Sequence, residues 1–180
     1  MINFEETYIK GLFIIKPDIY RDHRGYFFES YSKDKFQLNS INLEFMQDNV
    51  SHSIKKGTLR GLHFQEKPFE QSKIIYCLKG RIRDVAVDLR KDSKTYLKWF
   101  AVDLDDKNHY ALLIPKGFAH GFQTLENETI VNYKVDNPYN PNKDCTIIWN
   151  DPQLNIIWPI KQPILSDKDA KAPFVSNLNF

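Results

Sequence analysis

Cysteine is scarce in this sequence. Its two residues of this type, Cys77 and Cys145, lie far apart in the chain, and neither belongs to a Cys-x-x-Cys pair. Such usage favours buried, inert thiols in a reducing compartment over a disulfide framework. We therefore expect a cytoplasmic protein that is not stabilised by disulfide bonds.

A large charge of one sign and a long apolar run are also missing. The 25 Lys and Arg residues are scattered and oppose 23 Asp and Glu residues, which leaves a net charge of +2. This balance argues against nucleic acid or a membrane surface as a partner, although a few cations can still face one small anion. No apolar run could span a bilayer, and we expect no secretory signal, because the first residues reach two acids without a basic and apolar segment.

The composition that is present suits one compact domain covering residues 1–180. The chain is 42% hydrophobic and 14% aromatic, enough for a sizeable core. Short apolar runs alternate with Gly, Pro, Asn and Asp, and 13 Phe and 9 Tyr residues suit a pleated, half-buried surface. The pattern therefore predicts a mainly β protein.

Individual strands and two short helices can be predicted from the periodicity. In residues 83–90, apolar and charged side chains alternate with a period of two, which indicates a strand. Further strands are predicted at residues 12–15, 26–31, 73–78, 97–104, 110–114 and 130–135. Helices are predicted at residues 33–37 behind Ser32 and at 167–171 behind Ser166. Many short strands at this spacing indicate a sandwich or a barrel.

Two segments each place a histidine beyond a glycine. In residues 57–65, His63 follows Gly57 by six positions, and in residues 114–120, His120 follows a Pro-x-Gly turn. Both spacings resemble the two motifs of cupin proteins. The fold we expect is a double-stranded β-helix, the cupin or jelly-roll barrel, with a few short helices.

The same motifs argue against a metal site. Metal-binding cupins carry His-x-His and a following Glu in the first motif and a third His in the second. Here Gln65 replaces the second His, although Glu70 lies near the offset of the Glu. Two imidazoles, one carboxylate and a neutral amide match the usual ligand sets poorly, so we predict that no metal is bound. A two-His-one-carboxylate iron site, as in an oxygenase, needs the same residue types and stays open as an alternative.

Without a metal, the chain still carries a base, an acid and cations. His63 can act as a general base, because imidazole titrates near neutral pH. Arg60 precedes it and has the donor geometry that suits phosphate oxygens. Lys73 begins an apolar strand, where its ammonium could stabilise an enolate oxygen. Tyr133 lies between two valines on an expected interior face and could donate a proton.

Each of these residues alone also has a structural explanation. His63 could be a hydrogen-bonded structural histidine and Tyr133 a core aromatic. Arg60 and Lys73 could be solvated or ion-paired surface groups. Single residues therefore do not decide the function.

Other polar segments have structural explanations too. Asp169 follows Ser166 at a capping-box-like spacing, so its carboxylate could favour a helix N-terminus. Residues 24–29 could form a turn followed by a surface strand, and residues 47–49 an ordinary polar turn. Three histidines in polar surroundings are predicted to be surface residues: His23, His52 and His109.

The order of these segments along the chain is more specific. Blocks that follow one family's pattern occur at residues 21–29, 47–51, 59–65, 84–90, 114–122, 133–134, 149–152, 157–159 and 165–169. Through them the chain resembles the dTDP-4-dehydrorhamnose 3,5-epimerase family over nearly its whole length. The resemblance implies a cofactor-independent isomerase that inverts carbons 3 and 5 of a 4-keto-6-deoxy sugar carried on dTDP. It also implies a step in activated-rhamnose synthesis for surface polysaccharides such as the lipopolysaccharide O-antigen.

The resemblance also implies roles for individual residues. His63, oriented by Asp169, would remove the proton, Lys73 would stabilise the enolate, and Tyr133 would return a proton from the opposite face. Substrate contacts are implied at Arg24, Phe27, Glu29, Gln47, Asp48, Asn49, Arg60, His120, Asp144 and Lys168.

Within this set, the implied contacts divide between sugar, diphosphate and nucleoside. His120 would bond near the reacting sugar, and Arg60, with Arg24 from a neighbouring subunit, would hold the pyrophosphate. Glu29 and residues 47–49 would hold the nucleotide, and Phe27 would support its base. Family members are homodimers that exchange N-terminal strands, so we expect a homodimer.

One departure from the family pattern leaves the substrate open. Asp144-Cys145 stands where Glu-Gly is common, which shortens a substrate-binding side chain by one methylene. The alternative is therefore a 3-epimerase or a ketoisomerase acting on a different 4-keto nucleotide sugar, dTDP- or GDP-linked. A non-catalytic sugar-nucleotide binding barrel is disfavoured, because His63, Asp169 and Tyr133 are all present.

Overall fold

The computed structural model describes residues 2–178 of the chain. Its strands are β1 (Ile2–Glu6), β2 (Phe13–Pro17), β3 (Tyr20–Asp22), β4 (Gly25–Phe27), β5 (Gln47–Ser53), β6 (Leu59–Gln65), β7 (Lys73–Lys79), β8 (Arg81–Asp88), β9 (Trp99–Asp105), β10 (Ala111–Ile114), β11 (Phe118–Thr124), β12 (Thr129–Val135) and β13 (Asp144–Thr146). The helices are α1 (Lys33–Leu38), α2 (Asp167–Ala170) and a 3-10 helix at Val175–Asn177.

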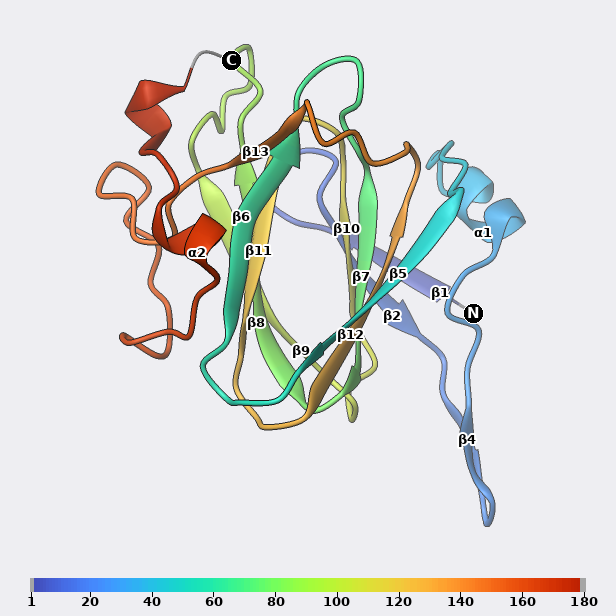
Figure 1. The fold of residues 1–180 in the computed structure, drawn as a ribbon. Helices are drawn as coiled ribbons and strands as arrows, with labels where there is room; N and C mark the ends of the chain where they lie inside the picture. Colours follow the sequence, from blue (N-terminus) through green and yellow to red (C-terminus); the bar gives the residue numbers. More distant parts are fainter. Residues whose placement is uncertain (1, 179–180) are drawn as a thin grey trace.

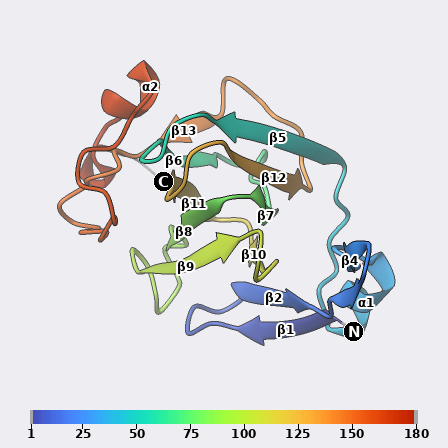
Figure 2. The ribbon, with the colours of Figure 1, turned by 90° about the horizontal axis from the view of Figure 1, so that it is seen from below.

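The strands form two facing antiparallel sheets and one separate hairpin. The larger sheet has the order β1-β2-β10-β7-β12-β5 and the smaller one β13-β6-β11-β8-β9, while β3 pairs with β4. Figure 2 shows β1 and β5 at opposite edges of the larger sheet. From β5 to β8, and again from β9 to β13, successive strands alternate between the two sheets, as in a jelly roll. The predicted mainly β fold is confirmed.

The core lies between the sheets, and both outer faces are partly covered. Ile75 and Leu112 of the larger sheet meet Phe122 of the smaller sheet inside. Segment 147–178 packs on the outer face of the smaller sheet, where it lies beside β6 and β8 in Figure 1. Because that sheet is covered on both sides, even Asp84 of β8 is fully buried.

The strands predicted from apolar alternation are confirmed as β2, β7, β8, β9, β10 and β12, and both predicted helices are present. The prediction for residues 26–31 is wrong beyond Phe27, where the strand ends. Residues 47–49 belong to strand β5 and not to a turn. Six strands were not predicted: β1 and β3, and four that carry polar or glycine-rich motifs, β5, β6, β11 and β13.

Two burial predictions need correction. Cys77 is buried, but Cys145 is only half-buried, so the expectation of two buried thiols is wrong for Cys145. His109 was expected at the surface and is 6% exposed, because the rings of Tyr26 and Phe28 pack against it. His23 and His52 are exposed as predicted.

The hairpin formed by β3 and β4 projects from the body of the protein (Figure 1). Three aromatic side chains of the hairpin itself are largely exposed: Tyr20, Tyr26 and Phe27. Within residues 2–178, no helix has both the length and the apolar character needed to cross a membrane.

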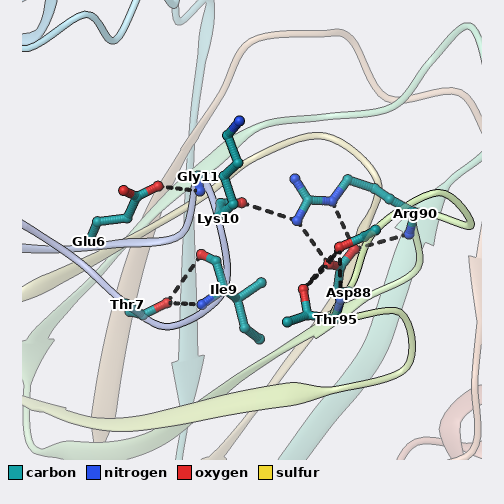
Figure 3. A network of polar contacts seen from close by, with 9 residues as sticks. Glu6, Thr7, Ile9, Lys10, Gly11, Asp88, Arg90 and Thr95 are labelled. Atoms are coloured by element: carbon teal, nitrogen blue, oxygen red, sulfur yellow. Dashed lines mark hydrogen bonds and ion pairs between the residues drawn. The ribbon is translucent and has the colours of Figure 1, made fainter.

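An ion pair between the partly exposed Arg90 and the buried Asp88 attaches the turn between β1 and β2 to the end of β8 (Figure 3). The guanidinium of Arg90 donates to both carboxylate oxygens of Asp88 and to the carbonyl of Lys10. Burial would raise the pKa of Asp88, but hydrogen bonds from Arg90, Ser93 and Thr95 lower it to about 2. The N-terminal turn is thus held by a carboxylate that is charged at neutral pH.

Candidate active site

A cavity with two adjoining lobes opens on the inner faces of both sheets. The first lobe has a volume of about 430 Å³ and the second about 380 Å³. His63, Lys73, Tyr133 and Lys168 line both lobes. The first lobe also contains Ser51, Arg60, His120, Ser166 and Asp169, and the second contains Gln47, Asn49, Tyr139 and Asp144.

The strand register explains why these side chains meet. His63 of β6 lies opposite His120 of β11, and Tyr133 of β12 lies opposite Asn49 of β5. Directly opposed residues of antiparallel strands point to the same face of the sheet. His63 and His120 therefore project from the smaller sheet, while Tyr133 projects from the larger one.

An irregularity at Gly61 lets Arg60 and His63 share the cavity. In a regular strand, residues three apart face opposite sides of the sheet. Here the register with β11 shifts between His120 and Phe122, which is the mark of a bulge. Gly61 has a φ of 131°, and a Cβ there would lie 2.5 Å from Cα of Gly121, so no side chain fits.

His63 and Asp169 form a hydrogen-bonded pair. Nε2 of His63 lies 2.6 Å from Oδ1 of Asp169, whose side chain is buried although His63 is partly exposed. Burial would raise the pKa of Asp169, but hydrogen bonds from His63, Ser166 and Gly61 outweigh it and lower the pKa below its usual value. The ionised carboxylate holds the proton on Nε2, which leaves Nδ1 as the basic nitrogen.

Asp169 serves the helix as well as the histidine. Its backbone N–H donates to Oγ of Ser166, the N-cap of α2, at 3.1 Å. Figure 1 shows α2 beside β6, so the cap holds the carboxylate next to His63. The sequence suggested that the carboxylate itself favours the helix N-terminus; in the structure, the backbone N–H of Asp169 bonds the cap while its carboxylate bonds His63.

A second histidine–aspartate pair lies deeper in the cavity. Nε2 of His120 is 2.7 Å from Oδ1 of Asp84, and both side chains are buried. Oδ2 of Asp84 has no hydrogen-bond partner among residues 2–178. Asp84 was not selected as a site residue from the sequence. An acidic residue in a strand that is buried on both faces is unusual, and this signal could have identified it.

Lys73 presents an unpaired ammonium to the cavity. Its side chain makes no hydrogen bond or ion pair within residues 2–178, so Asp144 and Asp84 act on it only through space. Burial lowers the pKa of Lys73 to about 8, although the two carboxylates oppose this shift. Lys73 is therefore mostly charged at neutral pH and can meet a developing negative charge.

Tyr133 faces the cavity from the opposite sheet. Burial raises the pKa of its hydroxyl, with Arg60 opposing this shift and Asp144 adding to it. Its hydroxyl makes no hydrogen bond within the described part of the chain. The residue therefore offers a protonated hydroxyl at neutral pH.

Polar side chains that can bind anions or amide groups lie around His63, Lys73 and Tyr133. Arg60 donates to Oγ of Ser53 at 3.2 Å and to the carbonyl of His52 at 3.1 Å, which fixes its guanidinium beside the first lobe. In the second lobe, the amide of Gln47 donates to Oδ1 of Asn49 at 2.7 Å. Both amides face the cavity because they are two residues apart in β5.

Asp144 occupies a small network in the second lobe. Its Oδ2 lies 2.5 Å from Nζ of Lys168 and accepts a hydrogen bond of 2.9 Å from Tyr139. Tyr139 was not selected from the sequence, because its loop position gives no periodic signal. The network joins the loop between β12 and β13 to α2.

Four of the implied substrate contacts do not line the cavity of their own chain. Asp48 alternates with Gln47 in β5, so it points to the other face, where it pairs with Lys134 at 2.9 Å. The other three, Arg24, Phe27 and Glu29, are exposed in or beside the projecting hairpin. Within this chain, Arg24 pairs with Asp22 at 2.5 Å and Glu29 pairs with Lys35 at 2.7 Å.

The cupin metal positions do not converge. The amide of Gln65 is used by backbone groups, since it donates to the carbonyls of Phe69 and Pro138 and accepts from the N–H of Asn140. Glu70 lines a separate cavity of about 580 Å³. Among residues 2–178, no three His, Cys, Asp or Glu side chains are grouped so that they could hold a metal ion.

Comparisons with known proteins agree on one family. The family model described as dTDP-4-dehydrorhamnose 3,5-epimerase matches residues 6–177. The chain is 48% identical over 170 residues to an enzyme of that name from Methanothermobacter thermautotrophicus, covering 92% of this chain and 90% of the relative.

Solved structures agree with the sequence comparisons. The enzyme of the same name from Bacillus anthracis, solved with TDP and PPi bound, has a TM-score of 0.95 and 47% identity, covering 97% of this chain and 100% of that one. The dTDP-6-deoxy-D-glucose-3,5-epimerase from Legionella pneumophila, solved in complex with dTDP-4-keto-L-rhamnose, also has a TM-score of 0.95. Its identity is 42%, and the match covers 99% of this chain and 95% of that one.

Proposed function

Because the chain belongs to the dTDP-4-dehydrorhamnose 3,5-epimerase family, we propose that it converts dTDP-4-dehydro-6-deoxy-D-glucose to dTDP-4-dehydro-L-rhamnose. The reaction is an isomerisation that inverts carbons 3 and 5 and needs no cofactor. One observation carries the assignment of the catalytic groups: a single cavity holds the His63–Asp169 pair, Lys73 and Tyr133.

The first step is removal of a proton next to the ketone. The 4-keto group acidifies the protons on carbons 3 and 5, since the resulting carbanion is an enolate. Nδ1 of His63 takes the proton, and the carboxylate of Asp169 stabilises the imidazolium that forms. Hydrogen bonds from Ser166 and Gly61 keep this carboxylate ionised and in place.

The second requirement is stabilisation of the enolate oxygen. Lys73 has a charged ammonium without a partner, so it can bond the oxygen without first breaking an ion pair. His120, held by Asp84, projects from the smaller sheet into the same lobe and is the second donor. Donors fixed in advance lower the barrier because they need not reorganise during the reaction.

Inversion follows from the placement of the acid. An enolate is planar, so configuration inverts only when the proton returns from the face opposite to the one it left. His63 projects from the smaller sheet and Tyr133 from the larger sheet, so the two residues flank a sugar bound between them. Tyr133 gives its proton to carbon, and exchange with solvent then returns a proton to Tyr133 and removes one from His63.

The remaining polar residues bind the nucleotide. Arg60 holds the diphosphate, and the amides of Gln47 and Asn49 bond the base or ribose. Asp144 and Lys168 contact the substrate from the second lobe. The hairpin region, with Arg24, Phe27 and Glu29, reaches the cavity of the other subunit in a homodimer with exchanged N-terminal strands.

We infer that the enzyme works in the cytoplasm, in a pathway that supplies activated rhamnose for surface polysaccharide. The two free thiols, Cys77 and Cys145, support a reducing compartment.

Proton exchange in deuterated water tests the reaction. The enzyme is incubated with dTDP-4-keto-6-deoxyglucose, and carbons 3 and 5 are followed by NMR. Deuterium and inversion at both carbons are expected. Incorporation at carbon 3 alone would make the enzyme a single-centre epimerase. Absence of exchange at both carbons would contradict the proposal and direct the search to GDP-linked sugars.

A further inference from the structure

His109 lies where the projecting hairpin meets the body of the protein. Its ring centroid is 4.4 Å from the ring of Tyr26 and 4.9 Å from the ring of Phe28. Tyr26 belongs to β4, and Phe28 directly follows that strand. The imidazole is thus in contact with two aromatic side chains from the base of the hairpin.

The flat faces of the rings make this contact. Nε2 of His109 is buried and has no hydrogen-bond partner among residues 2–178. The interplanar angles with Tyr26 and Phe28 are 41° and 30°, so the rings pack against each other in a tilted arrangement. A buried nitrogen without a hydrogen-bond partner is unfavourable. His109 therefore contributes here through the packing of its flat ring and not through a hydrogen bond from Nε2.

The turn that carries His109 is held by its own side chains. Oδ1 of Asp105 accepts from the N–H groups of Lys107 and Asn108, and Oδ1 of Asn108 accepts from the N–H of Tyr110. His109 has a φ of 52°, a left-handed conformation that a residue with a Cβ keeps only when its surroundings impose it. The turn therefore presents the imidazole in a fixed direction.

The hairpin has few other fixed points on its own chain. Arg24 pairs with Asp22, and the side chain of Arg21 lies over the ring of Tyr26, so these two contacts remain within the hairpin. Residues 20–28 make two ring contacts with the rest of the described chain, and both are with His109. The orientation of the hairpin, and of Arg24 on it, thus depends on this stack.

Burial favours the neutral form of the imidazole. Burial lowers the pKa of His109, and Arg21 adds to this effect, whereas Asp106 and Asp105 oppose it. A neutral ring needs no counter-ion and suits the apolar contact with Tyr26 and Phe28.

We propose that His109 is a positioning residue for nucleotide binding: it fixes the β3–β4 hairpin and thereby places Arg24 for the diphosphate in the neighbouring subunit's cavity. The inference rests on the proposed function, because it assumes that Arg24 contacts the diphosphate. His109 touches neither the substrate nor the reacting atoms, so its loss changes binding more than turnover.

The test compares His109→Ala and His109→Phe with Lys107→Ala, a matched control at an exposed position of the same turn. Two quantities are measured on each purified protein: kcat and KM for the dTDP-sugar, and hydrogen exchange of the amides in residues 20–28. For His109→Ala we expect faster exchange and a KM raised about tenfold, with kcat within about twofold of the unmodified enzyme. His109→Phe keeps a flat ring and restores both values, and Lys107→Ala changes neither.

Two further variants keep the result interpretable. Tyr26→Ala removes the stack from the exposed side, so it releases the hairpin even if His109→Ala does not fold. Arg24→Ala tests the underlying assumption and raises KM by itself. If Arg24→Ala leaves KM unchanged, the proposed role of Arg24 fails, and the inference fails with it.

Other outcomes would overturn the inference alone. Unchanged exchange in both His109→Ala and Tyr26→Ala would mean that the stack does not hold the hairpin. Faster exchange with an unchanged KM, while Arg24→Ala raises KM, would mean that the hairpin position does not control Arg24. His109→Ala could also lower kcat by the same factor by which it raises KM. If His109→Phe does not restore these values, the substitution damages the fold in general and the inference is wrong.

Discussion

Nε2 of His63 lies 2.6 Å from Oδ1 of Asp169, although 106 positions separate the two residues in the chain. The N-cap of a four-residue helix holds the carboxylate at this distance. A short helix thus orients the imidazole of a histidine on a distant strand.

Replacing Asp169 by Asn should nearly abolish turnover. The amide can no longer hold the proton on Nε2 or stabilise the imidazolium, so kcat should fall by about 10³-fold or more, as for the equivalent change in a serine protease triad. The rate is measured by NMR on the dTDP-sugar. The thermal unfolding midpoint serves as the control, since a large decrease would attribute the loss to α2 instead.

Replacing Tyr133 by Phe should separate exchange from inversion. His63 can still remove a proton and return a deuteron to the same face, so deuterium should enter carbons 3 and 5 with retained configuration. His63→Ala should lose exchange as well. The assignment of Tyr133 as the acid would be wrong if the Phe variant still inverted both carbons at the normal rate.

Replacing Lys73 by Met should stabilise the protein while it removes activity. The pKa of Lys73 is lowered to about 8, so folding at pH 7 carries a cost on the order of 1 to 3 kcal/mol, reduced because the cavity admits water. This cost is fully present below pH 8 and disappears as the pH rises toward 10.5. Denaturant unfolding at pH 7 and at pH 10 should therefore show a gain for the variant only at the lower pH.

The charge of Lys73 should also appear in the pH dependence of the enzyme. Since the ammonium is lost as the pH rises through about 8, the rate of enolate formation should decline above that pH. Exchange rates measured from pH 6 to pH 10 test this. A rate that stays constant across that range would argue against a catalytic charge on Lys73.

Replacing Asp88 by Asn should destabilise the fold by about 1 to 3 kcal/mol, because Arg90, Ser93 and Thr95 lose a charged hydrogen-bond acceptor. Since the pKa of Asp88 is lowered to about 2, its contribution to stability is complete above about pH 4 and is lost as the pH falls toward 2. Unfolding in urea at pH 7 and pH 3 measures both effects. Turnover of the folded variant should remain, since the network lies outside the two lobes of the catalytic cavity.

Apolar periodicity predicted the strands that form the core, such as β7 and β12, because their side chains alternate between the interior and a covered or solvated face. It missed β5 and β6, whose inner faces carry amides, arginine and histidine for the cavity. Polar inner faces remove the signal that marks a strand. The strands nearest the chemistry were therefore the hardest to predict.

The candidate site was predicted mainly through resemblance, because its members come from distant segments. The spacing of residues did not show that Asp48 faces away from Gln47, a consequence of strand alternation that appears only once β5 is recognised. From the sequence, Asp84 was identified only as a charged position in the alternating pattern of residues 83–90. His109 was misjudged because the aromatic residues that cover it come from another part of the chain.

The close approach of Gly61 and Gly121 limits how this protein can evolve. A methyl group at Gly61 would meet Cα of Gly121, and one at Gly121 would lie 2.9 Å from the carbonyl of Arg60. Neither glycine can be replaced alone without separating β6 from β11, so mutation cannot change the spacing of Arg60 and His63 in small steps. New substrate preferences in related lineages should therefore arise at other positions of the second lobe, such as Tyr139 in the loop before β13, where single substitutions leave the strands paired.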